Sequence, residues 1–241
     1  MAYRWLLFDA DGTLFDYEAA EHQALGETLA DYGLDARPEV LAAYQKINTR
    51  LWHDFEQGLT TPDRIKTERF ARLFEALGST GPALDPVRVG EAYLDHLGAC
   101  SQLLPDARTL LDTLVGKVHL ALITNGLTRV QRARLAHSGL NACFEAVVIS
   151  EEEGVAKPEP GIFDVIFSRM GHPHRSEVLM VGDSLTSDIR GANRYGIDAC
   201  WYNPRGLPRD LDVVDPLEIR YEIASLLDLV PIALDGTNAE A

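Results

Sequence analysis

Five short apolar runs, each followed closely by polar residues or glycine, constrain the fold of this chain more than any other feature of its sequence. The runs are rich in valine, isoleucine, leucine and aromatic residues and contain almost no charge. Strands that are buried on both faces of a parallel sheet have this pattern, because helices cover both sides. We therefore predict strands at residues 4–8, 118–124, 146–150, 178–182 and 199–202.

Helical patterns separate the later runs. Helices are predicted at residues 128–138, 160–170 and 216–229, the last with Pro216 in its first turn behind Asp215. The alternation of strands and helices predicts an α/β fold with a doubly wound parallel sheet, that is, a Rossmann-like core.

The stretch from residue 16 to residue 103 breaks this alternation. It contains helical patterns interrupted by glycine and proline, and it offers no convincing strand. An all-helical block between the first and second strands is typical of an inserted subdomain. We predict an α/β catalytic core at residues 1–15 and 104–241, and a helical cap at residues 16–103.

The charge and composition of the chain restrict the classes of partner that it can bind. The chain has 22 basic and 37 acidic residues, a formal net charge of −15, and this argues against nucleic acid, which requires clustered lysine and arginine. We find no export signal and no apolar run near the roughly 20 residues of a membrane span, so no membrane partner is expected. Three cysteines without metal or redox spacing indicate reduced core thiols and a cytoplasmic location. Monomer and homodimer both stay open.

Polar residues that could carry chemistry recur after the predicted strands. In a doubly wound sheet the carboxyl ends of the strands meet at one crevice, so these residues are expected to converge there. The set comprises Asp9, Asp11 and Thr13 after the first strand, Thr124 and Asn125 after the second, Lys157 after the third, and Asp183 and Asp188 after the fourth.

The pair Asp9 and Asp11 is the most informative part of this set. Gly12 permits a sharp turn, so both carboxylates could face one centre, where their like charges would need a cation. Mg²⁺ suits an all-oxygen set and accepts a phosphate oxygen. One carboxylate could then attack phosphorus and the other could move a proton. Lys157, Thr124 and backbone amides near Asn125 would hold the phosphoryl group.

The motifs DADGT, ITNG, VAKP and GDSLTSD stand in this order between residues 9 and 188. They resemble the motifs of phosphatases of the haloacid dehalogenase-like superfamily. The resemblance implies that Asp9 is the nucleophile and Asp11 the general acid/base. It also implies a Mg²⁺ site of Asp9, Asp11 (through its carbonyl) and Asp183, with Asp188 as a carboxylate behind these ligands and the helical insert as a mobile cap.

Longer segments, including LWHDFEQG and VVISEEEGVAKPEPGIF, resemble the pyrimidine 5′-nucleotidase branch of that superfamily. This resemblance implies a nucleoside monophosphate as the small-molecule substrate. Tyr44, Asn48, Trp52 and Phe55 could read its base, although aromatic residues at helical spacing are more often packing. The run Glu151–Glu153 is interpreted as a solvated face without chemistry.

Other functions remain compatible with the same motifs. A phosphoglycolate-type phosphatase, a sugar-phosphate phosphatase and a phosphomutase would share the core and differ in the cap. A dehalogenase is disfavoured because halide leaves without a proton, so that Asp11 would have no task. A non-catalytic binding protein is the alternative from another class, and it would tolerate the loss of Asp9, Asp11 or Lys157. Taken singly, Asp9 and Asp11 could also form an ordinary turn.

Overall fold

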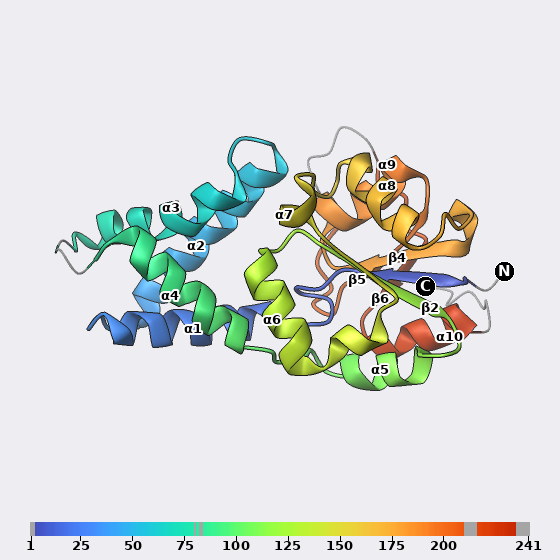
Figure 1. The fold of residues 1–241 in the computed structure, drawn as a ribbon, viewed down its shortest axis with the longest axis horizontal. Coiled ribbons are helices and arrows are strands. Elements are labelled where there is room, and N and C mark those ends of the chain that lie inside the picture. The colour runs from blue at the N-terminus through green and yellow to red at the C-terminus, as the bar shows by residue number, and fades with distance from the viewer. Residues whose placement is uncertain (1–2, 80, 82–83, 210–215, 235–241) are drawn as a thin grey trace. The chain divides into compact units, whose positions relative to one another are not determined.

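The computed structural model of the chain divides into two compact units (Figure 1). The α/β unit comprises Met1–Asp16, Leu103–Thr128 and Ser138–Ala241, and the helical unit comprises Tyr17–Gln102 and Arg129–His137. The residues that the structure describes are 3–79, 81, 84–209 and 216–234.

Six parallel strands form the sheet of the α/β unit, in the order β3-β2-β1-β4-β5-β6. The chain starts in the middle of the sheet and winds outward in both directions, so the predicted doubly wound fold is confirmed. The five predicted strands are also confirmed. The strands are β1 (Trp5–Phe8), β2 (His119–Thr124), β3 (Ala146–Ile149), β4 (Val178–Gly182), β5 (Asp198–Tyr202) and β6 (Tyr221–Ile223).

Helices cover both faces of this sheet (Figure 1). Side chains alternate between the faces along each strand, and all four residues of β1 are buried. Trp5 and Leu7 belong to the core under α8 and α9, and Leu6 and Phe8 face the other side. The helices are α5 (Ala107–Leu114), α7 (Ser150–Glu153), α8 (Pro160–Arg169), α9 (Arg190–Tyr195) and α10 (Leu229–Leu234), with single turns at Leu140–Cys143, Arg175–Glu177, Leu185–Ile189 and Leu226–Asp228.

The helix predicted at residues 216–229 is wrong. Residues Tyr221–Ile223 instead form β6, which pairs with β5 from Cys200 opposite Tyr221 onward. Tyr221 and Ile223 are buried and Glu222 is exposed, which is the two-residue period of a strand. Helical structure starts only after Ser225, whose side chain caps the next turn. Asp215, the expected start of the helix, lies outside the described residues.

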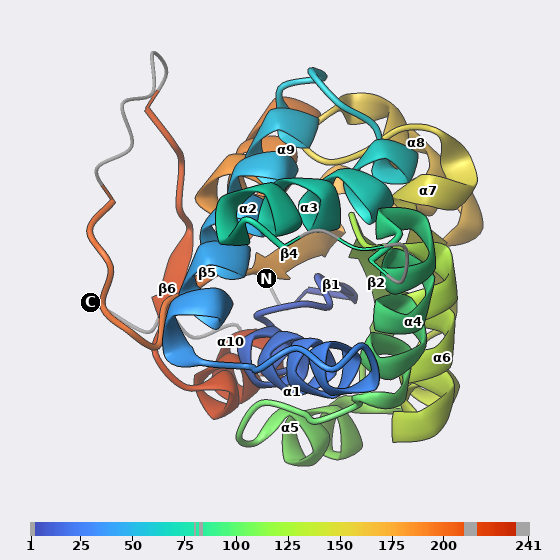
Figure 2. The same ribbon diagram turned by 90° about the vertical axis from the view of Figure 1, so that its left-hand side faces the viewer.

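The helical unit contains α1 (Tyr17–Asp31), α2 (Pro38–Glu56), α3 (Pro62–Leu77) and α4 (Pro86–Ala99). Three of these helices begin with proline, which has no N–H to leave unpaired at that position. Helix α1 packs on α4, α4 on α3, and α3 on α2 (Figure 2).

Most of helix α6 (Thr128–Ser138) belongs to the helical unit, although it follows β2 in the chain. Arg134 is fully buried and its Nε donates to the carbonyl of Cys100 at 2.9 Å. At the surface, Arg129 pairs with Glu91 and Asp95 of α4. Contacts within the helical unit therefore hold this helix.

Two further features concern the apolar character of the helices and the state of the cysteines. In the part of the chain that the structure describes, no helix is both long and apolar enough to cross a membrane. All three cysteines are free; Cys100 and Cys200 are buried, as expected of core thiols, and Cys143 is half-buried.

Candidate active site

Lys157 lies in the loop that follows β3, and its side chain links this loop to the segments that follow β1 and β4. Its side chain is 1% exposed. Its ammonium Nζ donates to Asp9 Oδ1 at 2.5 Å, to Asp188 Oδ1 at 2.7 Å and to the carbonyl oxygen of Ile123 at 2.9 Å. An ammonium has three protons, so all its donors are engaged. The lysine thus fixes two carboxylates that lie far apart in the sequence.

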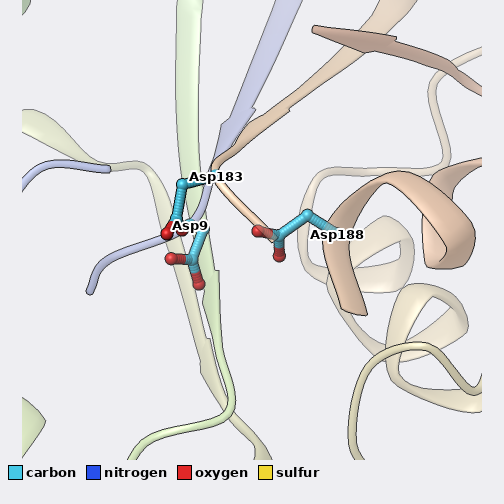
Figure 3. A group of neighbouring side chains, drawn as sticks. All are labelled: Asp9, Asp183 and Asp188. Atoms are coloured by element: carbon cyan, nitrogen blue, oxygen red, sulfur yellow. The ribbon is translucent and has the colours of Figure 1, made fainter. Parts of the chain in front are cut away.

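Three carboxylates meet at this point (Figure 3). Asp9, Asp183 and Asp188 each offer an oxygen, and these oxygens lie within 4.8 Å of one another. Burial raises the pKa of Asp9 well above its usual value, and the charges of Asp188 and Asp183 raise it further, whereas Lys157 lowers it. Burial and the charge of Asp188 also raise the pKa of Asp183, to about 7. One lysine does not balance this anionic cluster, and a divalent cation would.

The three carboxylates are not equivalent as cation ligands. Both oxygens of Asp188 already accept hydrogen bonds, Oδ1 from Lys157 and Oδ2 from the backbone N–H of Ser184 at 3.0 Å. Asp183 Oδ1 accepts a long bond of 3.4 Å from Thr13. Asp9 and Asp183 are therefore the better ligands, and Asp188 holds Lys157 in place.

Asp11 lies in the turn after β1. It is half-buried, and its backbone bridges Phe15, while Gly12 N–H donates to the Phe15 carbonyl at 3.0 Å. Gly12 has φ +83°, and a Cβ at this position would lie 2.4 Å from Asp183 Oδ2. Only glycine fits between this turn and Asp183.

The loop after β2 supports Lys157 from the other side. Asn125 Nδ2 donates to the carbonyl of Lys157, and Lys157 N–H donates to Asn125 Oδ1, both at 2.8 Å. The amide of Asn125 therefore clamps the lysine backbone. Thr124 is buried, and its Oγ1 accepts from Gly126 N–H at 3.2 Å. Nothing in the sequence indicated the clamp, because its partners are 32 residues apart.

Two other contacts were missed by sequence reasoning. The carbonyl of Asp183 accepts from Trp201 Nε1 at 2.9 Å, so β5 anchors the end of β4. Glu151 Oε2 accepts from Thr128 N–H at 2.7 Å and thereby caps the start of α6. A carboxylate at a helix start is a frequent cap, but Glu151 is 23 residues from Thr128.

Residues 3–196 match the model of the family described as haloacid dehalogenase-like hydrolase. The fold and the carboxylate–lysine site agree with this match. The chain belongs to the haloacid dehalogenase-like hydrolases, and it is a phosphoric monoester hydrolase.

Two relatives and one solved structure are similar to this chain over most of its length. Pyrimidine 5′-nucleotidase YjjG of Escherichia coli is 37% identical over 84% of this chain and 87% of its own, and pyrimidine 5′-nucleotidase PynA of Streptococcus pneumoniae is 36% identical over 95% of both. The crystal structure of the HAD-hydrolase YfnB of Bacillus subtilis, bound to magnesium, has a TM-score of 0.88 and 34% identity and covers 97% of this chain and 99% of its own.

Proposed function

We propose that this protein is a Mg²⁺-dependent phosphatase that hydrolyses pyrimidine nucleoside 5′-monophosphates through an aspartyl-phosphate at Asp9. The observation that carries the chemistry is the hydrogen bond from Lys157 Nζ to Asp9 Oδ1. It orients a buried carboxylate, and the positive charge of Lys157 opposes in part the burial that raises the pKa of Asp9 well above its usual value. A bound cation would favour further the anionic carboxylate that attacks phosphorus.

The reaction has two steps. The Asp9 carboxylate attacks phosphorus and the ester P–O bond breaks, while Asp11 gives its proton to the leaving oxygen. Asp11 then takes a proton from water, which attacks phosphorus and releases phosphate from Asp9. Lys157, clamped by Asn125 and paired with Asp188, keeps Asp9 in place during both steps. Thr124 and neighbouring backbone amides hold the phosphoryl oxygens.

The donor set fits Mg²⁺. Carboxylate oxygens of Asp9 and Asp183, together with the Asp11 carbonyl, are the hard oxygen ligands that this ion prefers. When bound, Mg²⁺ would supply positive charge for the phosphoryl oxygens. The magnesium in the structure of YfnB supports this assignment.

The substrate assignment is supported by the names of YjjG and PynA. Other relatives act on different esters, among them the ribulose-1,5-bisphosphate 5-phosphatase of Halopiger xanaduensis, 33% identical over 83% of this chain. A sugar phosphate is therefore the second candidate. We also propose a cytoplasmic location, which three free cysteines support.

A panel of phosphate esters tests the proposal. Thymidine and deoxyuridine 5′-monophosphates should give the highest kcat/KM, above ribulose-1,5-bisphosphate, phosphoglycolate and hexose phosphates. Activity should vanish with EDTA and return with Mg²⁺. A clear preference for a sugar phosphate would overturn the nucleotidase assignment, and an enzyme insensitive to EDTA would overturn the metal assignment.

A further inference from the structure

Asp183 is the proposed carboxylate ligand that Lys157 does not hold. The three protons of the lysine ammonium go to Asp9, to Asp188 and to the carbonyl of Ile123. Mg²⁺ requires near-ideal octahedral geometry, so each of its ligands must be kept in a fixed position. Other groups of the α/β unit must therefore orient Asp183.

The turn after β1 touches the carboxylate of Asp183. Thr13 Oγ1 donates to Asp183 Oδ1 at 3.4 Å, and the backbone at Gly12 approaches Oδ2 so closely that a Cβ would not fit between them. These contacts act on the end of the side chain. The direction of a short side chain such as aspartate also depends on the backbone that carries it.

The backbone of Asp183 lies one residue beyond the paired part of β4. Gly182, the last residue of that strand, is paired with Trp201 of β5. Beyond this point β5 bonds to β6, because Asn203 N–H donates to the carbonyl of Ile223 at 2.8 Å. The indole Nε1 of Trp201 instead donates to the carbonyl of Asp183 at 2.9 Å. A side chain thus continues the attachment of β4 to β5 up to the proposed ligand.

The indole ring is itself fixed. Trp201 is 2% exposed and packs in the core under α8 and α9, with Leu185 and Ile189 among the members of that core. We propose that Trp201 is a positioning residue for the Mg²⁺ site: its N–H holds the backbone of Asp183 and thereby the direction of the carboxylate. The inference rests on the proposed Mg²⁺ dependence and adds a residue 18 positions away from the ligand. A tryptophan that only filled the core would need its ring and not its N–H.

Trp201→Phe tests this role, because phenylalanine keeps an aromatic ring and lacks the N–H. The dissociation constant of Mg²⁺, measured by calorimetry without substrate, should rise about 3-fold to 10-fold, the effect of one lost hydrogen bond. Trp5→Phe is the matched control. Trp5 belongs to the same core at the start of β1, where its ring stacks on His119 at 4.6 Å. This control should lower the melting temperature and leave the dissociation constant unchanged.

An isosteric analogue removes the N–H without loss of packing. In 3-benzothienylalanine a sulfur atom replaces the indole N–H, and the two fused rings remain. The chain contains three tryptophans, so the analogue is incorporated in a Trp5→Phe/Trp52→Phe background, in which only position 201 carries it. Trp52 lies in the helical unit, with its ring 5.7 Å from that of Phe55. Compared with tryptophan in the same background, the analogue should weaken Mg²⁺ binding about 3-fold to 10-fold.

The outcomes separate this role from the metal assignment. An unchanged Mg²⁺ dissociation constant with the analogue would overturn the role of Trp201 and leave the metal site intact. Equal losses of affinity in Trp201→Phe and Trp5→Phe would also overturn it, because the loss would then come from the core as a whole. A wild-type protein that binds no Mg²⁺ would overturn the metal assignment and this inference together. The analogue decides the question even if Trp201→Phe does not fold.

Discussion

At the scale of single residues, the proposed chemistry depends on how the neighbours of Lys157 hold its side chain and backbone. The lysine is buried, all its protons are donated, and its backbone is clamped by one asparagine. Asp188 contributes through this lysine, because its two oxygens are already occupied. Asn125 likewise acts as a positioning residue, because both polar atoms of its amide bond to the backbone of Lys157.

Replacement of Asn125 by alanine should therefore lower kcat about 10-fold to 100-fold with little change in KM, because a displaced ammonium no longer orients Asp9. Asn125→Asp keeps the acceptor for Lys157 N–H and should lose less. The measurement is steady-state kinetics on an aryl phosphate.

Asn193 provides a matched control. Its amide clamps the backbone of Glu218 with the same pair of bonds, both at 2.8 Å, in another part of the α/β unit. Asn193→Ala should lower the melting temperature and leave kcat unchanged. If Asn125→Ala behaves in the same way, the clamp is only structural.

At the scale of elements, the turn between β1 and α1 places the proposed metal ligands Asp9 and Asp11 and packs against Asp183. Gly12→Ala should raise the Mg²⁺ concentration needed for half-maximal activity at least 10-fold, because the new methyl group would displace Asp183. Gly33→Ala is the control: its φ is also positive, at +68°, but nothing lies within 4 Å of the added carbon. It should cost about 1–2 kcal/mol of stability and leave the Mg²⁺ requirement unchanged. Equal Mg²⁺ requirements in both variants would contradict this role of Gly12.

Sequence patterns predicted the elements that repeat a simple period. Five buried strands were recognisable because each is a short apolar run. β6 was not recognisable, because only three residues form it. Pro216 before it and the leucines after Ser225 have the pattern of a helix, with proline in its first turn. The convergence of the candidate site residues was predictable, since they follow strand ends. The clamp by Asn125 and the cap by Glu151 were not, because they join segments that only the folded chain brings together.

At the scale of the whole molecule, the acidic chain should gain stability from the proposed Mg²⁺ ion. Mg²⁺ at about 100 times its dissociation constant should add about 2.7 kcal/mol, which raises the melting temperature by roughly 5–10 °C for a chain of this size. Asp183→Asn should abolish most of this rise, and Asp112→Asn, an exposed acid, should not. Thermal unfolding with EDTA and with Mg²⁺ measures both. A rise that survives in Asp183→Asn would place the ion elsewhere.

Local sequence patterns did not indicate that most of helix α6 groups with the helical unit. Helix α6 follows a strand of the sheet, and its sequence therefore predicted membership of the core. In the structure, Arg134 and Arg129 of this helix bond to Cys100 and Glu91 of the helical unit. The domain bounds 1–15, 16–103 and 104–241, and the role of the helical unit as a cap, stay predictions.

The central claim is that Asp9 carries the phosphoryl group. Enzyme quenched during turnover and treated with borohydride should contain homoserine at position 9, because borohydride reduces an aspartyl-phosphate to that residue. Peptide mass spectrometry locates the change. The account predicts homoserine at position 9 and nowhere else, and none in Asp9→Asn, which should also lose several orders of magnitude in kcat. Homoserine at another aspartate, or full turnover by folded Asp9→Asn, would contradict it.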